Sequence, residues 1–504
     1  MVSIGDTISN IGIGLSFAIS PEALVYCFLG VTLGTFIGVL PGVGVLATVS
    51  ILLPFTFYVD PKVSLIMLAG IYYGAAYGGS TASILLNMPG TSSSAITCLD
   101  GYPMTKQGRG GIALFMTAIA SFAGSFIGIL MLAAFAPPLA GLARSFGSQE
   151  YVALMVLGLL AASLLSTSSA MKSLVTVVFG LLLGIVGIDV NSGQPRLTYG
   201  FTELQDGIAL VGLALGLFGV PEVIANAGRI KGVVAEAKGI TLRSMLPTRE
   251  DWRRSWKPML RGTGIGSFFG ALPGTGGMIA SFMSYALEKR LHKDPSQFGK
   301  GAVEGVAAPE ASNNAAVQTA FIPTLTLGIP GDPVMAILLG VMMIHGIAPG
   351  PSLVNANPEV FWGLVVSFLI GNIILLILNI PLIGIWVRLI SIPYNYLYPA
   401  IVVFLCIGVF SINNSVFDLY MVIFFGLVGY FMVLLRFEPA PLILGFILGP
   451  LLEENFRRSL VLSRGDMFTF FERPVSGSIF LVAFLLVAWI VIAELRNRYL
   501  ARKG

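Results

Sequence analysis

Two short segments place oxygen-bearing side chains at proline-glycine breaks inside apolar stretches. The first, NMPGTSSSA, covers residues 87 to 95, and the second, GIPGDPVMA, covers residues 328 to 336. Hydroxyl, amide and carboxylate oxygens suit a hard cation such as sodium. The unpaired backbone N–H groups at a helix start suit a carboxylate or a phosphate. These segments therefore predict a site for an anionic solute, a cation or both.

Two further breaks share a Leu-Pro-Gly pattern, GVLPGVG at 38 to 44 and GALPGTGG at 270 to 277. Non-helical backbone inside a bilayer must line a cavity or be buried in protein, because unsatisfied amides in lipid cost several kcal/mol each. A new helix is expected to begin after each of the four breaks, at Gly44, Thr91, Gly276 and Asp332. We expect these helix starts to converge near the middle of the membrane and to form an anion site without buried arginines.

The candidate ligands follow from these breaks. The residues expected to bind the anionic substrate are Gly42, Gly44, Asn87, Gly90, Thr91, Ser92, Gly274, Thr275, Gly276 and Gly331. The residues expected to bind the cation are Ser80, Thr81, Asn313, Asn314, Thr326 and Asp332. Two alternatives stay open, because Ser, Thr and Asn also join membrane helices by hydrogen bonding, and Asp332 could serve only as a helix cap. Glu310, in APEASNNAA, could be a ligand or an interfacial cap.

The composition shows what kind of chain must position these groups. Of 504 residues, 56% are hydrophobic and only 11% are charged, whereas soluble domains carry roughly 25% charged residues. Apolar runs long enough to cross a bilayer, which needs about 20 residues, recur along the chain. We expect an all-α integral membrane protein with about 11 to 14 membrane segments, some of them broken.

The order of the breaks predicts two diverged repeats. In each half a Leu-Pro-Gly motif precedes a Pro-Gly break, and such ordered landmarks indicate an internal repeat. The expected division is a first membrane repeat at 1–228, a basic cytoplasmic loop at 229–261 and a second membrane repeat at 262–504.

Charges beside the Leu-Pro-Gly motifs predict that the repeats are inverted. Basic residues flank the second motif on both sides, with Arg261 before it and Lys289 after it. Both flanks should therefore be cytoplasmic, and the segment should form a re-entrant hairpin. The first motif has no Lys or Arg before it and only Lys62 after it, so it is expected to open to the opposite side. Inverted repeats with broken helices are typical of secondary transporters.

Other function classes have little support in the sequence. No HExxH motif, P-loop or nucleophile-elbow Gly-x-Ser-x-Gly is present, so we expect no enzymatic activity and no cofactor. The basic region at 229–261 lies between membrane segments, which argues against a nucleic-acid partner. Cys27, Cys98 and Cys406 lie far apart and indicate neither a disulfide framework nor a thiolate metal site.

Several long motifs together carry a family resemblance. GVLPGVGVLATVSILLPFTF, YYGAAYGGSTASILLNMPGTSSSAITCLDGYPMTKQG, GALPGTGGMIASFMSYALEKR, APEASNNAA and LGIPGDPVMAILLG are similar to the large membrane subunit of the tripartite tricarboxylate transporters. The resemblance covers residues from about 20 to 475.

The resemblance implies a multi-pass permease in the bacterial inner membrane that works with a small membrane subunit and a periplasmic solute-binding protein. It implies secondary uptake of tricarboxylates or related carboxylates with sodium as the coupling ion, and it does not imply which carboxylate is carried. The alternative from another class is an uncoupled anion channel or a scaffold subunit of a membrane complex.

Overall fold

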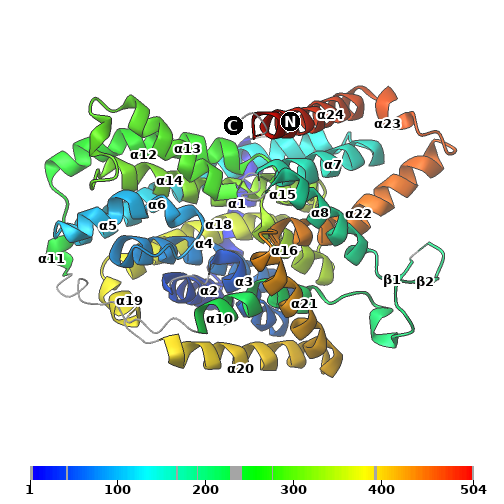
Figure 1. The fold of residues 1–504 in the computed structure, drawn as a ribbon, viewed down its shortest axis with the longest axis horizontal. Coiled ribbons are helices and arrows are strands. Elements are labelled where there is room, and N and C mark those ends of the chain that lie inside the picture. The colour runs from blue at the N-terminus through cyan, green and yellow to red at the C-terminus, as the bar shows by residue number, and fades with distance from the viewer. Residues whose placement is uncertain are drawn as a thin grey trace. The chain divides into compact units, whose positions relative to one another are not determined.

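The computed structural model describes the backbone of residues 4–40, 44–165, 169–189, 191–227, 241–274, 276–390 and 394–501 (Figure 1). This part of the chain is helical apart from loops and one antiparallel hairpin, in which β1 (Gly187–Ile188) pairs with β2 (Pro195–Arg196). The all-α expectation is therefore confirmed. The inverted relation of the repeats and the re-entrant hairpins stay predictions.

Four helices of the described chain are long and apolar enough to cross a membrane. They are α2 (Pro21–Val39), α6 (Gly110–Ala143), α18 (Pro358–Asn379) and α21 (Val416–Leu434). Shorter apolar helical stretches of 10–17 residues include Val45–Tyr58, Leu210–Ala225 and Pro333–Ile344. The fold fits a membrane protein, and the expected count of spanning segments stays a prediction.

The chain forms two compact units, and each unit combines one segment from the first half of the sequence with one that lies mostly or wholly in the second half. The first comprises Met1–Ala140 and Val211–Tyr430, and the second comprises Gly141–Leu210 and Phe431–Gly504. This division by compactness differs from the expected division by sequence repeat and does not test it.

The remaining helices of the first unit are α1 (Ile4–Ala18), α3 (Val45–Leu52), η1 (Leu53–Tyr58), α4 (Pro61–Leu86), η2 (Ser93–Ala95), α5 (Cys98–Lys106), α9 (Leu210–Ala214), η4 (Leu215–Gly219), α10 (Val220–Ala227), α11 (Leu242–Met245), α12 (Arg249–Gly270), α13 (Gly276–Leu291), η5 (Pro295–Gln297), α14 (Glu304–Thr319), α15 (Phe321–Leu327), α16 (Pro333–Ile344), α17 (Leu353–Ala356), α19 (Ile383–Ile390) and α20 (Tyr394–Asn413). Helix α12 begins within the expected loop at 229–261, of which residues 228–240 lie outside the described chain.

The second unit contains α7 (Ser148–Leu165), α8 (Ala170–Gly184), η3 (Thr202–Leu204), α22 (Ala440–Leu462), α23 (Thr469–Glu472) and α24 (Pro474–Ala501). Helices α8 and α22 pack closely because Gly180 faces the Leu442 carbonyl and Gly445 faces the Val177 carbonyl. None of the candidate binding residues belongs to this unit.

Two helix pairs of the first unit pack through the same arrangement of glycines. In the pair α2 and α4, the glycines of α2 face carbonyls of α4: Gly30, Gly34 and Gly38 lie against Met67, Ile71 and Ala75. In the pair α12 and α14, the glycines of α12 face carbonyls of α14: Gly262, Gly266 and Gly270 lie against Ala308, Ser312 and Ala316. A side chain at any of these glycines would collide with the opposing backbone. Small residues at such positions let membrane helices approach closely.

We call each of these rows of three glycines, together with the carbonyls that it faces, a glycine seam. Each seam leads directly into a Leu-Pro-Gly motif. Gly38 ends the first seam and Gly270 ends the second, and both open the motif that follows. The next helix starts at a glycine of positive φ in both cases, Gly44 at +66° before α3 and Gly276 at +64° in α13. Glycine adopts this left-handed backbone without a steric penalty. The helix starts after the two motifs therefore share a left-handed glycine as well as their sequence pattern.

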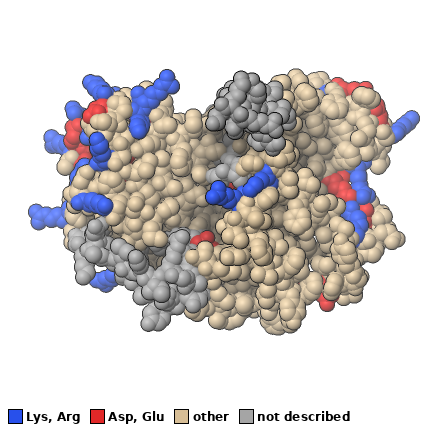
Figure 2. Space-filling view, viewed as in Figure 1, with Lys and Arg blue, Asp and Glu red and all other residues tan. Residues whose placement is uncertain are grey.

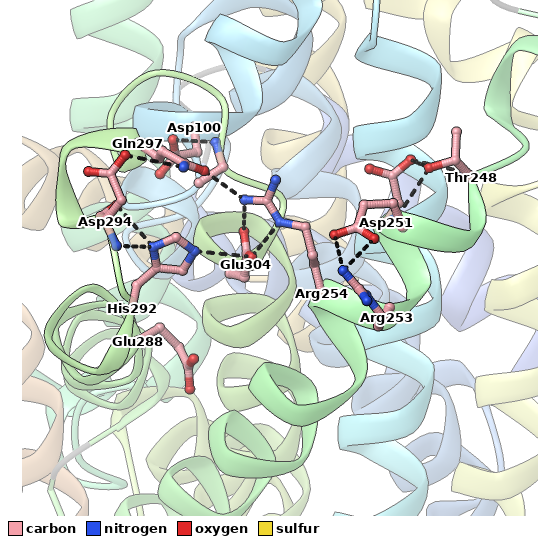
Figure 3. A network of polar contacts seen from close by, with 12 residues as sticks. Asp100, Thr248, Asp251, Arg253, Arg254, Glu288, His292, Asp294, Gln297 and Glu304 are labelled. Atoms are coloured by element: carbon pink, nitrogen blue, oxygen red, sulfur yellow. Dashed lines mark hydrogen bonds and ion pairs between the residues drawn. The ribbon is translucent and has the colours of Figure 1, made fainter.

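Charged side chains gather at one end of the α12–α13 pair (Figure 2). Arg254 donates to both Glu304 oxygens at 2.7 and 2.9 Å, and His292 Nε2 lies 3.6 Å from the same carboxylate (Figure 3). On the neighbouring α5, the buried Asp100 Oδ1 accepts backbone N–H bonds from Gly299, Gly301 and Ala302 at 2.8 to 2.9 Å. These contacts hold the connection between α13 and α14 in place.

Candidate functional site

Each Leu-Pro-Gly loop is hydrogen-bonded to the Pro-Gly break of its own sequence half. The Gly44 N–H donates to the Gly90 carbonyl at 3.1 Å, and the Gly274 N–H donates to the Gly331 carbonyl at 2.8 Å. The structure therefore joins the two breaks of each half, which lie tens of residues apart in the sequence.

The two halves also meet at these breaks. Helix α3, which follows the first Leu-Pro-Gly loop, packs against α16, which follows the second Pro-Gly break. Reciprocally, α13 packs against η2, which follows the first Pro-Gly break. In Figure 1, α3 and α16 lie side by side. The four breaks thus lie in one region of the first unit.

The two Pro-Gly breaks have the same backbone pattern. Helix α4 ends at Asn87 with φ +56°, and α15 ends at Gly328 with φ +68°, so both end in the left-handed conformation. Three residues later, Gly90 packs on Gly79 and Gly331 packs on Ala320. The correspondence extends to the packing partner, because each glycine contacts a residue eleven positions earlier.

The side chains that follow the two glycines act as equivalent caps. Thr91 Oγ1 accepts the N–H of Ser94 at 3.2 Å, and Asp332 Oδ1 accepts the N–H of Met335 at 2.9 Å. Asp332 caps α16, with Pro333 in its first turn as the sequence predicts. The expected helix start at Thr91 is wrong, because only the single 3₁₀ turn η2 follows, and α5 begins at Cys98. The first break therefore offers a turn where the second offers a helix N-terminus.

Eight of the ten expected anion-binding residues lie in the described chain, and Gly42 and Thr275 lie outside it. The eight form the loops and breaks described above. Asn87 and Ser92 are exposed, whereas Gly90, Thr91 and Gly331 are buried. Gly44, Gly274 and Gly276 are partly accessible. The candidate residues therefore include accessible side chains and backbone next to buried residues that pack against the helices.

Among the expected cation ligands, Asp332 lies at the second Pro-Gly break, directly after Gly331. Its side chain is only 5% exposed, and Tyr72 of α4 donates a hydrogen bond to Oδ2 while Met335 N–H occupies Oδ1. The start of α13 lies beside Asp332, because Gly276 approaches the Asp332 Cβ. The next residue, Gly277, lies against Asn313 Oδ1, where a side chain at Gly277 would collide with this oxygen. Asn313 Nδ2 is buried without a hydrogen-bond partner.

The other expected cation ligands do not join this cluster. Ser80 donates to Glu310 at 2.6 Å, and Asn314 donates to Ser121 at 2.8 Å. Thr326 donates to the Ile322 carbonyl of its own helix at 2.6 Å. Thr81 lines a separate small cavity with Tyr77 and Asn379. The six candidates thus occupy several places along α4, α14 and α15 and at the start of α16.

Glu310 is a buried carboxylate that the list of expected ligands omits. It is 1% exposed and accepts hydrogen bonds from Thr97 at 2.5 Å and from Ser80 at 2.6 Å. Both donors come from the first sequence half, whereas Glu310 comes from the second. The signal in the sequence was an acidic residue inside the apolar APEASNNAA stretch, which left a ligand and an interfacial cap equally open.

Comparison with known proteins identifies the family. Residues 24–444 match the model of the tripartite tricarboxylate transporter TctA family. The chain is 50% identical over 493 residues, 98% of each chain, to an uncharacterized 52.8 kDa protein in the TAR-I ttuC' 3'region of Agrobacterium vitis. It is 51% identical over 233 residues to an uncharacterized protein in the TAR-II ttuC' 3'region of the same organism, which covers 46% of this chain and 96% of that protein. The chain is therefore a multi-pass membrane protein that belongs to the tripartite tricarboxylate transporter TctA family.

Proposed function

We propose that the chain is the permease subunit of a binding-protein-dependent secondary transporter in the bacterial inner membrane. It imports tricarboxylates or related carboxylates and couples their uptake to sodium. Its partners are a small membrane subunit and a periplasmic solute-binding protein. Family membership supports the transport role and the presence of partner subunits.

The convergence of the four breaks is the observation that carries this proposal. Helices α3, α13 and α16 all begin at these breaks, and the first N–H groups of a helix have no partner within that helix. No side chain caps α3, whereas Asp332 accepts one N–H of α16. Helix N-termini stabilise anions through these groups and through the helix dipole. The helix starts in this region therefore suit a solute with several carboxylates, provided that the charge of Asp332 is balanced.

The cation belongs beside Asp332 in this proposal. An uncompensated carboxylate at membrane depth is costly, and beside an anionic substrate it would also repel. A sodium ion between the two negative charges removes both penalties. Asn313 and Asp332 supply oxygens next to the second Leu-Pro-Gly loop.

The proposed orientation places the charged end of α12 and α13 in the cytoplasm. Lys257 and Arg261 lie on α12, and Lys289 and Arg290 lie at the end of α13. The positive-inside tendency assigns both ends of this hairpin to the same side. The two repeats are then inverted about the site, as in many secondary transporters. Cysteine labelling that placed position 257 outside and position 290 inside would contradict this orientation.

Solute uptake into membrane vesicles tests the function. Vesicles that hold both membrane subunits are supplied with solute-loaded binding protein, with and without an inward sodium gradient. Coupled uptake should collapse when the gradient is abolished. Flux that follows only the gradient of the solute itself would instead indicate the alternative, an uncoupled anion channel.

A further inference from the structure

Glu310 is a buried carboxylate without a basic partner. Its two oxygens accept hydrogen bonds from the hydroxyls of Thr97 and Ser80. None of the ion pairs found within the described chain involves Glu310. Hydroxyl groups solvate a carboxylate but do not neutralise its charge, and an uncompensated charge in apolar surroundings is costly.

Asn314, one helical turn after Glu310, has an oxygen with no hydrogen-bond partner. Its Nδ2 donates to Ser121 Oγ at 2.8 Å and to the Glu310 carbonyl at 3.0 Å. A carbonyl can only accept, so the second bond fixes the orientation of the amide. Asn314 Oδ1 is thereby left buried and unbonded. Such an acceptor requires a water molecule or a cation as its partner.

Polar groups continue from this point along the faces of α6 and α14. Gln318 on α14 and Ser125 and Thr117 on α6 also have buried polar atoms without partners. The two helices approach closely at Gly124 and Gly128. Thr117 also lines a cavity of about 10 Å³ together with Tyr77 and Thr81 of α4, which is close to the space that one water molecule needs.

We propose that Glu310 is the carboxylate of a second cation site, which binds sodium and is separate from the Asp332 site. Its other oxygen donors are Ser80, Thr97, Ser121 and Asn314. One carboxylate with neutral hydroxyl and amide oxygens balances a single positive charge, whereas calcium sites use more acidic ligands. Tyr72, beside Asp332, and Ser80, beside Glu310, lie eight residues apart on α4, about 12 Å along the helix.

The site bridges the two sequence halves. Ser80 and Thr97 flank the first Pro-Gly break, whereas Glu310 and Asn314 belong to the second half. A sodium ion bound here would therefore hold the first break against α14. The inference rests on the proposed sodium coupling and deepens it by giving the transporter two coupling sites.

Direct sodium binding to the purified full-length chain in nanodiscs tests the proposal. Equilibrium binding of ²²Na⁺ is measured without carboxylate for the parent and for Glu310→Gln, which keeps the shape but removes the charge. Glu310→Gln should lose one bound ion per chain or bind it at least tenfold more weakly. Asp332→Asn, measured in parallel, should keep the ion at Glu310. Unchanged stoichiometry and affinity in Glu310→Gln would overturn the proposal.

A second pair of variants keeps the test decisive if Glu310→Gln fails to fold. Thr97→Val removes one ligand oxygen with little change of shape and should weaken sodium binding several-fold. Thr176→Val is the matched control, because the buried Thr176 hydroxyl donates to the Lys172 carbonyl of its own helix in the second unit, which holds none of the candidate binding residues. Equal sodium affinity in these two variants would contradict the site.

Binding and uptake separate this inference from the proposed function. Uptake that ignores the sodium gradient, with ²²Na⁺ binding still lost in Glu310→Gln, would refute coupling and keep the site. Sodium-driven uptake with unchanged binding in Glu310→Gln would refute the site and keep coupling. A parent chain that binds no sodium at neutral pH would overturn the assignment to sodium.

Discussion

The two Pro-Gly breaks have the same backbone pattern, a left-handed residue followed three positions later by a closely packed glycine. They differ in the charge of the side chain that comes next. Thr91 and Asp332 occupy the same capping position after the break, and only the second is acidic. The glycine seams show a second difference of this kind. Glu310 lies two residues after Ala308, whereas Ala69 lies two residues after Met67, the equivalent seam position.

This difference in charge separates two requirements of the proposed site, which are backbone N–H groups for the anion and acidic side chains for the cation. In the proposed site, backbone N–H groups from both halves bind the carboxylates of the substrate. The acidic side chains of the two proposed cation sites, Asp332 and Glu310, both come from the second half, so the proposed cation binding is asymmetric. A second acidic set in the first half would add desolvation cost without an evident ligand.

The largest expected effect comes from disrupting the close helix packing that the two glycine seams share. Gly266→Leu should abolish folding, because its side chain would collide with the Ser312 carbonyl in the α12–α14 seam. Even smaller over-packing costs about 1 to 3 kcal/mol. Gly34→Leu, in the equivalent α2–α4 seam, should have the same effect. Size-exclusion chromatography of the detergent-solubilised protein measures the folded yield.

The control for this comparison lies on the same helix. Gly264 has no atom within 4 Å of where a side chain would lie. Gly264→Ala should therefore keep the parent yield. Normal folding of either seam variant would show that close helix approach does not hold these repeats together.

The second prediction sharpens the difference between the equivalent caps. Asp332→Asn keeps an oxygen and the capping geometry but removes the charge, so the half-saturating sodium concentration for uptake should rise by about tenfold. Thr91→Val should cost about 1 kcal/mol of stability through the lost hydrogen bond to the Ser94 N–H and should change the half-saturating sodium concentration much less than Asp332→Asn does. A sodium titration of vesicle uptake compares the two. An Asp332→Asn variant with parental half-saturation would show that Asp332 is only a helix cap.

The smallest expected effect concerns Asp251, at the charged end of α12. Burial favours its protonated form, but hydrogen bonds from Thr248 and the Arg109 guanidinium outweigh it and lower the pKa of Asp251. Its stabilising contribution is therefore complete above the unfolded pKa of about 3.9 and disappears as the pH falls through the lower folded pKa.

Thermal unfolding of the parent and Asp251→Asn checks this sign. Between pH 6 and 8 the variant should melt about 1 to 3 °C lower. The gap should narrow as the pH falls below about 4. A gap that widened at acid pH would contradict the assigned direction.

The sequence predicted the positions of the breaks better than their partners. Proline and glycine mark non-helical backbone locally, so Gly44, Gly276 and Asp332 were identified as helix starts and lie where expected. The turn after Thr91 was missed, because a hydroxyl cap predicts a helix without showing how soon that helix ends. The pairing of Ser80 with Glu310 depends on contact between α4 and α14, which no local pattern encodes.

Substrate protection of an accessible residue at the breaks tests the central claim most directly. In a background in which the three cysteines are replaced, Ser92→Cys at the first break and Ser192→Cys in the second unit are treated with a hydrophilic thiol reagent; both serines are exposed. Citrate and a panel of other di- and tricarboxylates are added with sodium. The account predicts that the transported carboxylate slows modification of Ser92→Cys at least several-fold and leaves Ser192→Cys unchanged. Equal modification rates at position 92 with and without a carboxylate that the complex demonstrably transports would contradict it.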